Sequence, residues 1–316
     1  MDNNKTRRPL LRRSLALGAA TLGSALALTA AVAAPASAGT AGSAGVSGRH
    51  GTDYVALGDS LASGPGIPTQ VDANCARSNS NYPSLIAAAS GARLTDVSCS
   101  GASTVNMTAP QGTAAPQFDA LNRDTDLVTL SIGVNNIGVD GAGFTSIITT
   151  CAQLSASDLA GGPCRDFFNS TGSDLLRTNI ANAAPKVAAT LAGIHQRAPH
   201  ARVFVIGYPD LFPDDGSSCT SAAVPFAAGD FAYLRDSEKA LNSMLVRQAA
   251  LGGARYVDTY KPTVGHDMCE PAGERWIEPV VPTTAAAPAH PNALGHQAMA
   301  GAIERSIRGC APRRNG

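Results

Sequence analysis

Short aliphatic runs recur along the chain, and each is bounded by glycine, proline, aspartate or serine. An apolar run of about four to eight residues between such turn-favouring residues is typical of a buried strand. Strands that are apolar on consecutive positions belong in a sheet covered on both faces, which is the usual setting of parallel strands. We therefore predict a buried sheet. Its strands fall at residues 54–57, 94–97, 127–132, 203–206 and 256–257.

Apolar residues at helical spacing lie between and after these runs. Residues 180–194, 241–249 and 294–307 each place an apolar stripe on one helix face, which we expect to pack against the sheet. Short strands alternating with helices predict an α/β fold, a three-layer α/β/α sandwich with a central, mainly parallel five-stranded sheet, flavodoxin-like in architecture. The stretches 138–175 and 209–235 are rich in glycine, proline, serine and aspartate and are predicted to be long surface loops. Such loops often form the walls of a substrate site.

The first 38 residues have the layout of an export signal. Four arginines make a basic start, an alanine-rich apolar stretch begins at Leu15, and Ala36-Ser37-Ala38 provides a small-residue cleavage site. A retained membrane anchor is the alternative, because the apolar stretch is long enough to span a bilayer. The cleavage site favours removal. We therefore expect a secreted protein without stable membrane insertion, exported by the Sec or the twin-arginine route.

The rest of the chain is predicted to be one folded domain. Residues 39–51 are mainly glycine, alanine and serine and are expected to be a flexible leader, with the domain at 52–316. Residues 1–38 carry five basic residues and one acidic residue, so their removal takes the net charge from zero to about −4. A mildly acidic domain has no electrostatic reason to bind nucleic acid. We expect no nucleic-acid partner and a monomeric protein.

Seven cysteines in an exported chain favour disulfides, because the compartment outside the cell is oxidising. None belongs to a Cys-x-x-Cys pair and no histidine cluster accompanies them, so a zinc site is not expected. The odd number leaves one cysteine unpaired or paired between molecules. The pairing order cannot be read from the sequence alone. The seven are Cys75, Cys99, Cys151, Cys164, Cys219, Cys269 and Cys310.

Polar residues that could carry chemistry follow three of the predicted strands. In a parallel sheet, functional residues gather just beyond the carboxyl ends of the strands. Ser60, Gly101 and Asn135 follow the first, second and third strand, and His290 precedes the last helix. A serine hydroxyl needs a base to become a nucleophile, and a developing oxyanion needs fixed hydrogen-bond donors. Taken singly, each of these residues could also belong to a turn or a helix cap. The four together predict a serine hydrolase.

With Gly58-Asp59-Ser60 at its first strand, the chain resembles the SGNH, or GDSL-type, hydrolases, especially the secreted actinobacterial lipases and esterases. The resemblance runs from residue 54 to residue 292. It implies Ser60 as the nucleophile and His290 as the base. The N–H groups of Ser60 and Gly101 and the side-chain amide of Asn135 would form the oxyanion hole, and no metal or cofactor is implied. It also implies three disulfides in sequence order, with Cys310 left over. These are Cys75–Cys99, Cys151–Cys164 and Cys219–Cys269.

Two positions depart from the family pattern. Asn136 stands where the family usually has an aspartate that supports its loop, so the loop geometry is expected to persist. Ala287 stands where the acidic member of a catalytic triad is expected. That member fixes the imidazole tautomer and stabilises the imidazolium, and a backbone carbonyl can fill the first of these roles. We predict a Ser60–His290 dyad whose histidine is oriented by the Ala287 carbonyl.

These residues predict a serine carboxylic-ester hydrolase that acts on acyl or lipid esters through an acyl-enzyme. A carbohydrate deacetylase on the same fold is one alternative, and a non-enzymatic binding protein, which the missing acid at Ala287 would suit, is another. Asp267 and Glu278 are the nearby acids in sequence that could replace the missing triad member. The preferred acyl-chain length cannot be read from the sequence.

Overall fold

The computed structural model describes residues 51–309. The predicted export segment, all but the last residue of the predicted leader, and Cys310 lie outside these residues.

Five parallel strands form the central sheet, in the spatial order β4-β1-β5-β6-β7. Each strand lies at one of the apolar runs that predicted it. Their bounds are β1 Asp53–Gly58, β4 Arg93–Asp96, β5 Leu127–Ser131, β6 Arg202–Ile206 and β7 Arg255–Val257. A small antiparallel pair, β2 (Gln70–Asp72) and β3 (Arg77–Ser78), lies in the connection between β1 and β4.

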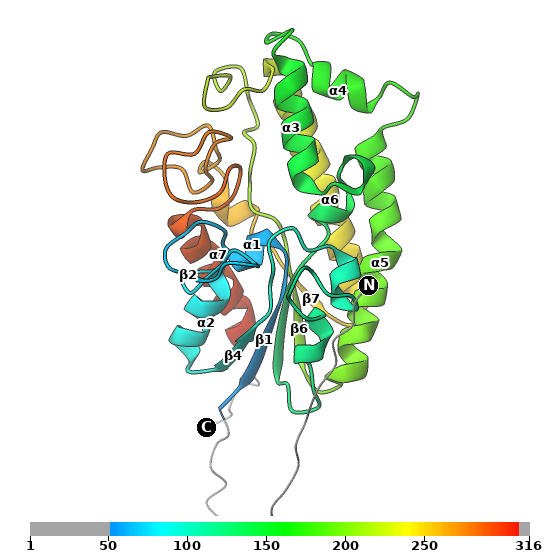
Figure 1. Ribbon diagram of the computed structural model, residues 1–316, viewed down its shortest axis with the longest axis vertical. Helices are drawn as coiled ribbons and strands as arrows, with labels where there is room; N and C mark the ends of the chain where they lie inside the picture. The colour runs from blue at the N-terminus through cyan, green and yellow to red at the C-terminus, as the bar shows by residue number, and fades with distance from the viewer. Residues whose placement is uncertain (1–50, 310–316) are drawn as a thin grey trace, which may run out of the picture. The chain divides into compact units, whose positions relative to one another are not determined.

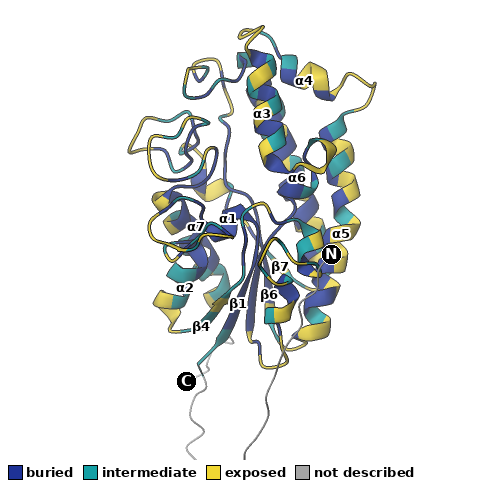
Figure 2. Cartoon of the chain, in the orientation of Figure 1, coloured by how far each residue is buried: buried dark blue, intermediate teal, exposed yellow. Residues whose placement is uncertain are grey.

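Helices cover both faces of the sheet (Figure 1), with α2 and α7 packed together on one face and α5 and α6 on the other. They are α2 Tyr82–Ser90, α5 Leu175–Arg197, α6 Phe231–Leu251 and α7 Ala293–Gly309. Neighbouring side chains of a strand point to opposite faces. In β1, Val55 therefore packs in the core on the α5–α6 side and Ala56 in the core on the α2–α7 side. The central strands β1, β5 and β6 are largely buried between helices whose outer surfaces are exposed (Figure 2), whereas the edge strand β4 is partly exposed. The predicted three-layer α/β/α sandwich is confirmed.

The stretch 138–175 contains two complete α-helices, so its prediction as a surface loop was wrong. α3 is Phe144–Ser155 and α4 is Pro163–Phe168. Phe144, Ile147 and Cys151 return at helical spacing and are buried. Threonines between them lower the helix propensity and obscured this stripe. Helix α2 was not predicted, because its nine residues are too few to show a clear apolar stripe. The stretch 209–235, in contrast, contains no α-helix or strand until α6 begins.

Three disulfides cross-link the described chain, and they are the pairs that the family resemblance implied. They join Cys75 to Cys99, Cys151 to Cys164 and Cys219 to Cys269. The second ties α3 to α4. The first joins the connection after β2 to the loop after β4.

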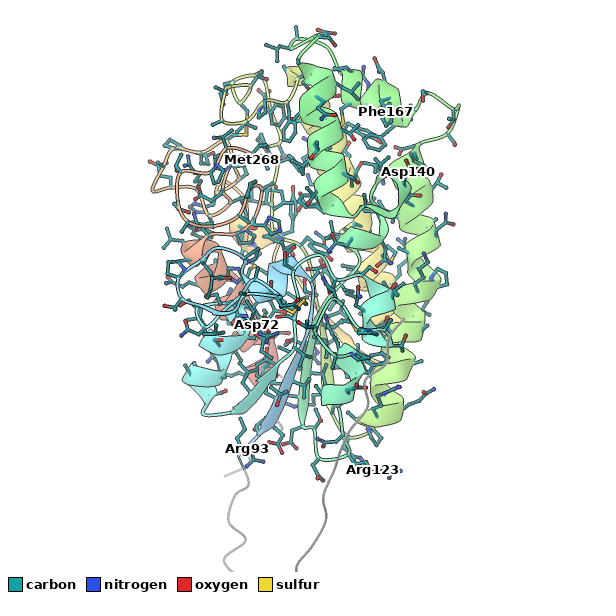
Figure 3. All side chains as sticks on the ribbon, in the orientation of Figure 1. Asp72, Arg93, Arg123, Asp140, Phe167 and Met268 are labelled. Atoms are coloured by element: carbon teal, nitrogen blue, oxygen red, sulfur yellow. A yellow bond between two sulfur atoms is a disulfide. The ribbon has the colours of Figure 1, made fainter. Side chains whose placement is uncertain are left out.

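The carboxyl ends of all five strands lie along one edge of the sheet. The short helix α1 (Ser60–Ser63) continues from the end of β1, and α3 and α4 lie beyond the same edge (Figure 1). Arg93 and Arg123 lie at the opposite end, far from Phe167 of α4 (Figure 3). The edge that carries the predicted catalytic residues is therefore the one framed by α3 and the loops.

Candidate active site

Ser60 directly follows the tight turn that joins β1 to α1. Gly58 is required there, because a Cβ atom at this residue would lie 2.6 Å from the Ser131 carbonyl oxygen. The carboxylate of Asp59 accepts the N–H of Leu61 at 3.0 Å and caps α1. Ser60 is the first residue of this helix and is buried. The first N–H groups of a helix have no acceptor within it, so that of Ser60 is available to an oxyanion.

Tyr208 links this turn to the loop after β5. Its hydroxyl donates to the second carboxylate oxygen of Asp59 at 2.7 Å and accepts the N–H of Val134 at 2.9 Å. Burial raises the pKa of Asp59 to about 7, and the hydrogen bonds from Tyr208 and Leu61 oppose that rise. No sequence pattern predicted a role for Tyr208. Its place just after β6 is the signal that could have found it, because polar residues gather at that edge of the sheet.

The side chain of Asn135 is held at both of its polar atoms. Its Oδ1 accepts the N–H of Phe144 at 3.0 Å, and its Nδ2 donates to the Ala102 carbonyl at 2.9 Å. An asparagine amide has two hydrogens, so the second one stays available. Ala102 follows Gly101, whose φ is +81°. The structure thus brings the amide of Asn135 against the loop that carries Gly101.

Asn136, which replaces the family's usual aspartate, also uses both ends of its amide. Its Oδ1 accepts the N–H of Thr104 at 3.2 Å and its Nδ2 donates to the Thr104 hydroxyl at 2.8 Å. An aspartate could make the first of these bonds and would accept the hydroxyl proton in the second. The loop after β5 is thereby tied to the loop after β4, as expected for this substitution.

His290 is buried, and the carbonyl of Pro288 lies 2.7 Å from its Nδ1. A neutral imidazole that donates from Nδ1 presents Nε2 as an acceptor, and Nε2 here is buried without a partner among the described residues. Burial lowers the pKa of His290, although the bond to Pro288 opposes this. The side chain is thus held in the neutral form that a general base requires.

The carbonyl that meets His290 is not that of Ala287, so this prediction was wrong by one residue. Ala289 has φ +56°, which turns the chain so that the carbonyl two residues before His290 faces its ring. Ala287 instead donates its N–H to the Pro65 carbonyl at 3.0 Å. That bond fastens the histidine loop to the segment just after α1. The structure therefore brings the histidine loop beside the helix that begins with Ser60.

The carboxylates of Asp267 and Glu278 have other partners than His290. Asp267 accepts the N–H of Cys269 at 2.8 Å. Glu278 is fully buried, accepts from the Asn292 side chain at 3.1 Å and from the N–H of Thr283 at 3.0 Å. Burial raises the pKa of Glu278, but these bonds and the nearby arginine outweigh it and lower the pKa overall. Its N–H donates to the His290 carbonyl at 2.9 Å, so Glu278 stabilises the loop rather than the imidazole.

An apolar pocket lies against the Asn135 side of this arrangement. Phe144 lines it and also packs edge-to-face on His290, with the ring centroids 6.1 Å apart. Val134, which precedes Asn135, lines it as well. The other lining side chains are Ile137, Tyr208 and residues of α3, α5, α6 and the stretch 209–235, and most are aliphatic or aromatic. The expectation that the stretches 138–175 and 209–235 form walls near the site agrees with this lining.

Within residues 51–309, no group of histidine, cysteine, aspartate and glutamate side chains could hold a metal ion. None of the helices in that range is long and apolar enough to cross a membrane.

Comparison with known proteins identifies the class to which this fold and site belong. The model of the GDSL-like lipase/acylhydrolase family matches residues 56–298. Lipase 2 of Streptomyces coelicolor is 42% identical over 300 residues, which cover 93% of this chain and 96% of that lipase. A lipase of Streptomyces rimosus is 32% identical over 240 residues, covering 72% of this chain and 77% of that protein.

Two crystal structures share the fold. That of a phospholipase A1 from Streptomyces albidoflavus superposes with a TM-score of 0.66 at 29% identity, covering 83% of this chain and 100% of that one. That of an extracellular lipase from Streptomyces rimosus gives a TM-score of 0.60 at 29% identity, covering 82% of this chain and 100% of that one. These matches define a three-layer α/β ester hydrolase. The chain belongs to the GDSL-like lipase/acylhydrolase family, and the predictions of fold, family and enzyme class are confirmed.

Proposed function

We propose that this enzyme hydrolyses lipid acyl esters through a covalent acyl-enzyme, with Ser60 as nucleophile and His290 as general base. His290 Nε2 takes the Ser60 proton as the hydroxyl attacks the ester carbonyl, and it returns that proton to the leaving alcohol. Water then attacks the acyl-enzyme with the same base. The observation that supports this assignment best is the neutral, Pro288-bonded His290, whose Nε2 is left without another partner.

The oxyanion of each tetrahedral intermediate is proposed to accept three hydrogen bonds. The donors are the N–H groups of Ser60 and Gly101 and the second Nδ2 hydrogen of Asn135. The first N–H of α1 and the doubly anchored amide of Asn135 are fixed before substrate arrives. Donors that need no reorganisation are the ones that stabilise a transition state most.

An acyl chain is the proposed occupant of the mostly apolar pocket that Phe144 and Val134 line, and the pocket has to widen to admit it, because its volume is only about 30 Å³. Phe144 both lines the pocket and packs on His290, and most of the remaining lining is aliphatic or aromatic, with Tyr208, Ser237 and Glu238 as its polar side chains. Apolar lining favours a fatty acyl group over a sugar, because burying sugar hydroxyls there would leave them without partners. The relatives named lipase and phospholipase A1 support this substrate class, and no observation favours the carbohydrate deacetylase or the non-enzymatic alternative.

Export and a monomeric state are part of the same proposal. Three disulfides in the described chain suit an oxidising compartment. One relative is named an extracellular lipase.

Hydrolysis of p-nitrophenyl esters of increasing acyl length tests the substrate class, and a serine-reactive phosphonate tests the nucleophile. We expect activity to rise from acetate to longer acyl groups, and a single labelled peptide containing Ser60. Full activity of Ser60→Ala would refute the nucleophile. Preference for acetate, with turnover of acetylated sugars, would replace the lipid substrate by a glycan.

A further inference from the structure

The Gly101 N–H belongs to a β-turn, Cys99 to Ala102, in which the Ala102 N–H donates to the Cys99 carbonyl at 3.0 Å. Gly101 is the third residue of this turn and has φ +81°, as a type II turn requires. Types I and II differ in which way the central peptide faces, here the peptide that joins Ser100 to Gly101. Glycine adopts either sign of φ at little cost. Gly101 by itself therefore does not decide which way its own N–H points.

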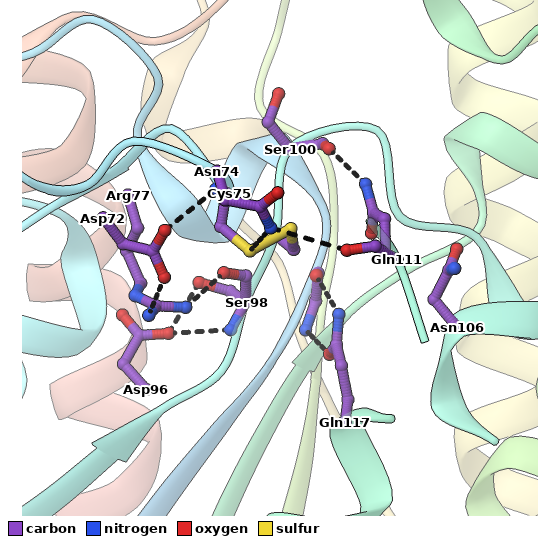
Figure 4. Close-up of a disulfide and its surroundings, with 12 residues drawn as sticks. Asp72, Asn74, Cys75, Arg77, Asp96, Ser98, Ser100, Asn106, Gln111 and Gln117 are labelled. Atoms are coloured by element: carbon purple, nitrogen blue, oxygen red, sulfur yellow. Dashed lines mark hydrogen bonds and ion pairs between the residues drawn. A yellow bond between two sulfur atoms is a disulfide. The ribbon is translucent and has the colours of Figure 1, made fainter. Parts of the chain in front are cut away.

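Gln111 binds this central peptide. Its Nε2 donates to the Ser100 carbonyl at 2.7 Å (Figure 4). A peptide unit is planar and trans, so its carbonyl and its N–H point in opposite directions. Fixing the Ser100 oxygen thus fixes the direction of the Gly101 N–H.

The backbone of Gln111 is itself well anchored. Its N–H and carbonyl exchange hydrogen bonds with Ala114, both at 3.0 Å, and its carbonyl also accepts from the Asn74 side chain at 3.4 Å (Figure 4). On the other side of the turn, the Ser100 N–H donates to the carbonyl of Cys75, at the disulfide. The turn is therefore held at both sides.

The Oε1 atom of Gln111 is buried and has no partner among the described residues. A buried unpartnered acceptor disfavours folding, and a methionine would occupy similar space without that cost. The Oε1 atom therefore contributes nothing to the fold, and the part of the amide that has a role is the Nε2 donor, which fixes the direction of the Ser100–Gly101 peptide.

We propose that Gln111 is a positioning residue for catalysis, which selects the turn orientation that points the Gly101 N–H at the oxyanion. The proposal rests on the proposed function, in which Gly101 is an oxyanion donor. Gln111 acts through the peptide and does not touch the substrate.

Gln111→Met removes the donor at nearly constant size. Loss of one neutral hydrogen bond shifts a two-state equilibrium by about two- to tenfold, and complete loss of an oxyanion donor costs about 10²–10³ in kcat. We expect kcat to fall about tenfold with KM within twofold. A boronic acid that forms a tetrahedral adduct on the serine should bind about tenfold more weakly. A purely structural role would instead lower the unfolding midpoint and leave kcat per folded molecule unchanged.

Gln111→Glu supplies a second test, in which one variant is compared with itself at different pH values. Its ionised carboxylate cannot donate to the Ser100 carbonyl, whereas its protonated form can. The ratio of its kcat to that of the wild type should therefore rise as the pH falls. The wild type and the variant share the charged groups near the turn, which are Asp72, Arg77 and Asp96 (Figure 4), so the titration of these groups cancels in the ratio. Exposed Gln196→Glu on α5 introduces the same charge far from the turn and should show a flat ratio.

A ratio for Gln111→Glu that does not change with pH, or a Gln111→Met variant with unaltered kcat and boronate affinity, would overturn this inference. These outcomes can be told apart from a failure of the proposed function. In that case the phosphonate would label a residue other than Ser60 in the unaltered enzyme.

Discussion

The hydroxyl of Tyr208 joins the two loops that carry the proposed nucleophile and the proposed oxyanion amide. It lies 2.7 Å from a carboxylate oxygen of Asp59, next to Ser60, and 2.9 Å from the N–H of Val134, next to Asn135. The backbone of Tyr208 is fixed in turn by the Asn242 side chain, which binds both its N–H and its carbonyl. This buried hydroxyl therefore adds a side-chain link between the two loops to the pairing of β1 with β5.

Tyr208→Phe should lower both stability and turnover. The variant leaves the Val134 N–H and one oxygen of Asp59 without partners, which should reduce the free energy of unfolding by about 1–3 kcal/mol. We expect kcat to fall about tenfold, equivalent to about 1.4 kcal/mol of transition-state stabilisation, with little change in KM. Chemical denaturation and ester hydrolysis measure the two effects.

Tyr54→Phe is the matched control. Its hydroxyl bonds Thr129 Oγ1 at 2.8 Å in the core on the α2–α7 side of the sheet. Its removal should cost stability and leave kcat unchanged. An unchanged kcat in Tyr208→Phe as well would show that the tyrosine serves the fold alone.

Asp59→Asn should reveal the cost of the buried acid through the pH dependence of stability. The pKa of Asp59 is raised from 3.8 to about 7 in the folded protein, so the folded state binds more protons than the unfolded state between these values. Stability of the wild type then falls as the pH rises from about 4 to about 7, on the order of 4 kcal/mol for this residue. The difference from Asp59→Asn should follow this curve in urea denaturation. A constant difference across that range would contradict it.

Catalysis by a dyad predicts that no side-chain acid is needed at His290. Asp267→Asn and Glu278→Gln should each keep kcat within about tenfold, whereas an amide in place of a triad aspartate costs about 10⁴. His290→Ala should abolish turnover. Glu278→Gln should lower stability, because the carboxylate accepts from Thr283 and Asn292 in the fold. A thousandfold loss of kcat in either acid variant, with its fold intact, would establish a triad instead.

The pH dependence of the enzyme should reflect the lowered pKa of His290. The neutral imidazole is the base, so kcat/KM should be lost only as the pH falls through that lowered value. The acidic limb should therefore lie below pH 6.5, the ordinary value for histidine. A limb above pH 6.5 in a pH–rate profile would show that burial does not control this residue.

Asn135→Ala should act on the transition state. Removal of one oxyanion donor typically costs about 10²–10³ in kcat, or about 2.7–4 kcal/mol. The Phe144 N–H also loses its acceptor, so a stability loss should accompany the rate loss. Asn135→Asp keeps the acceptor for Phe144 but places an anionic oxygen against the Ala102 carbonyl and the oxyanion, so its rate loss should be at least as large as that of Asn135→Ala. A rise in KM alone would mean that Asn135 only binds substrate.

The apolar runs and polar strand-end residues determined the layers of this protein and the edge that carries its chemistry. A strand covered on both faces must be apolar on consecutive residues, so the sequence displayed the central strands β1, β5 and β6 most clearly, whereas the edge strand β4 is partly exposed. The family resemblance of the residues around Ser60 and His290 indicated the enzyme class. Both kinds of signal are local, because each depends on residues that are adjacent along the chain.

Only the tertiary structure decided which distant groups fix those residues in place. The Pro288 carbonyl, rather than that of Ala287, faces His290 because Ala289 takes a left-handed conformation. No sequence motif predicts that conformation. Tyr208 lies 149 residues from its partner Asp59 in the sequence. Hydrogen bonds between distant segments depend on distances and angles that packing sets, and sequence spacing records neither.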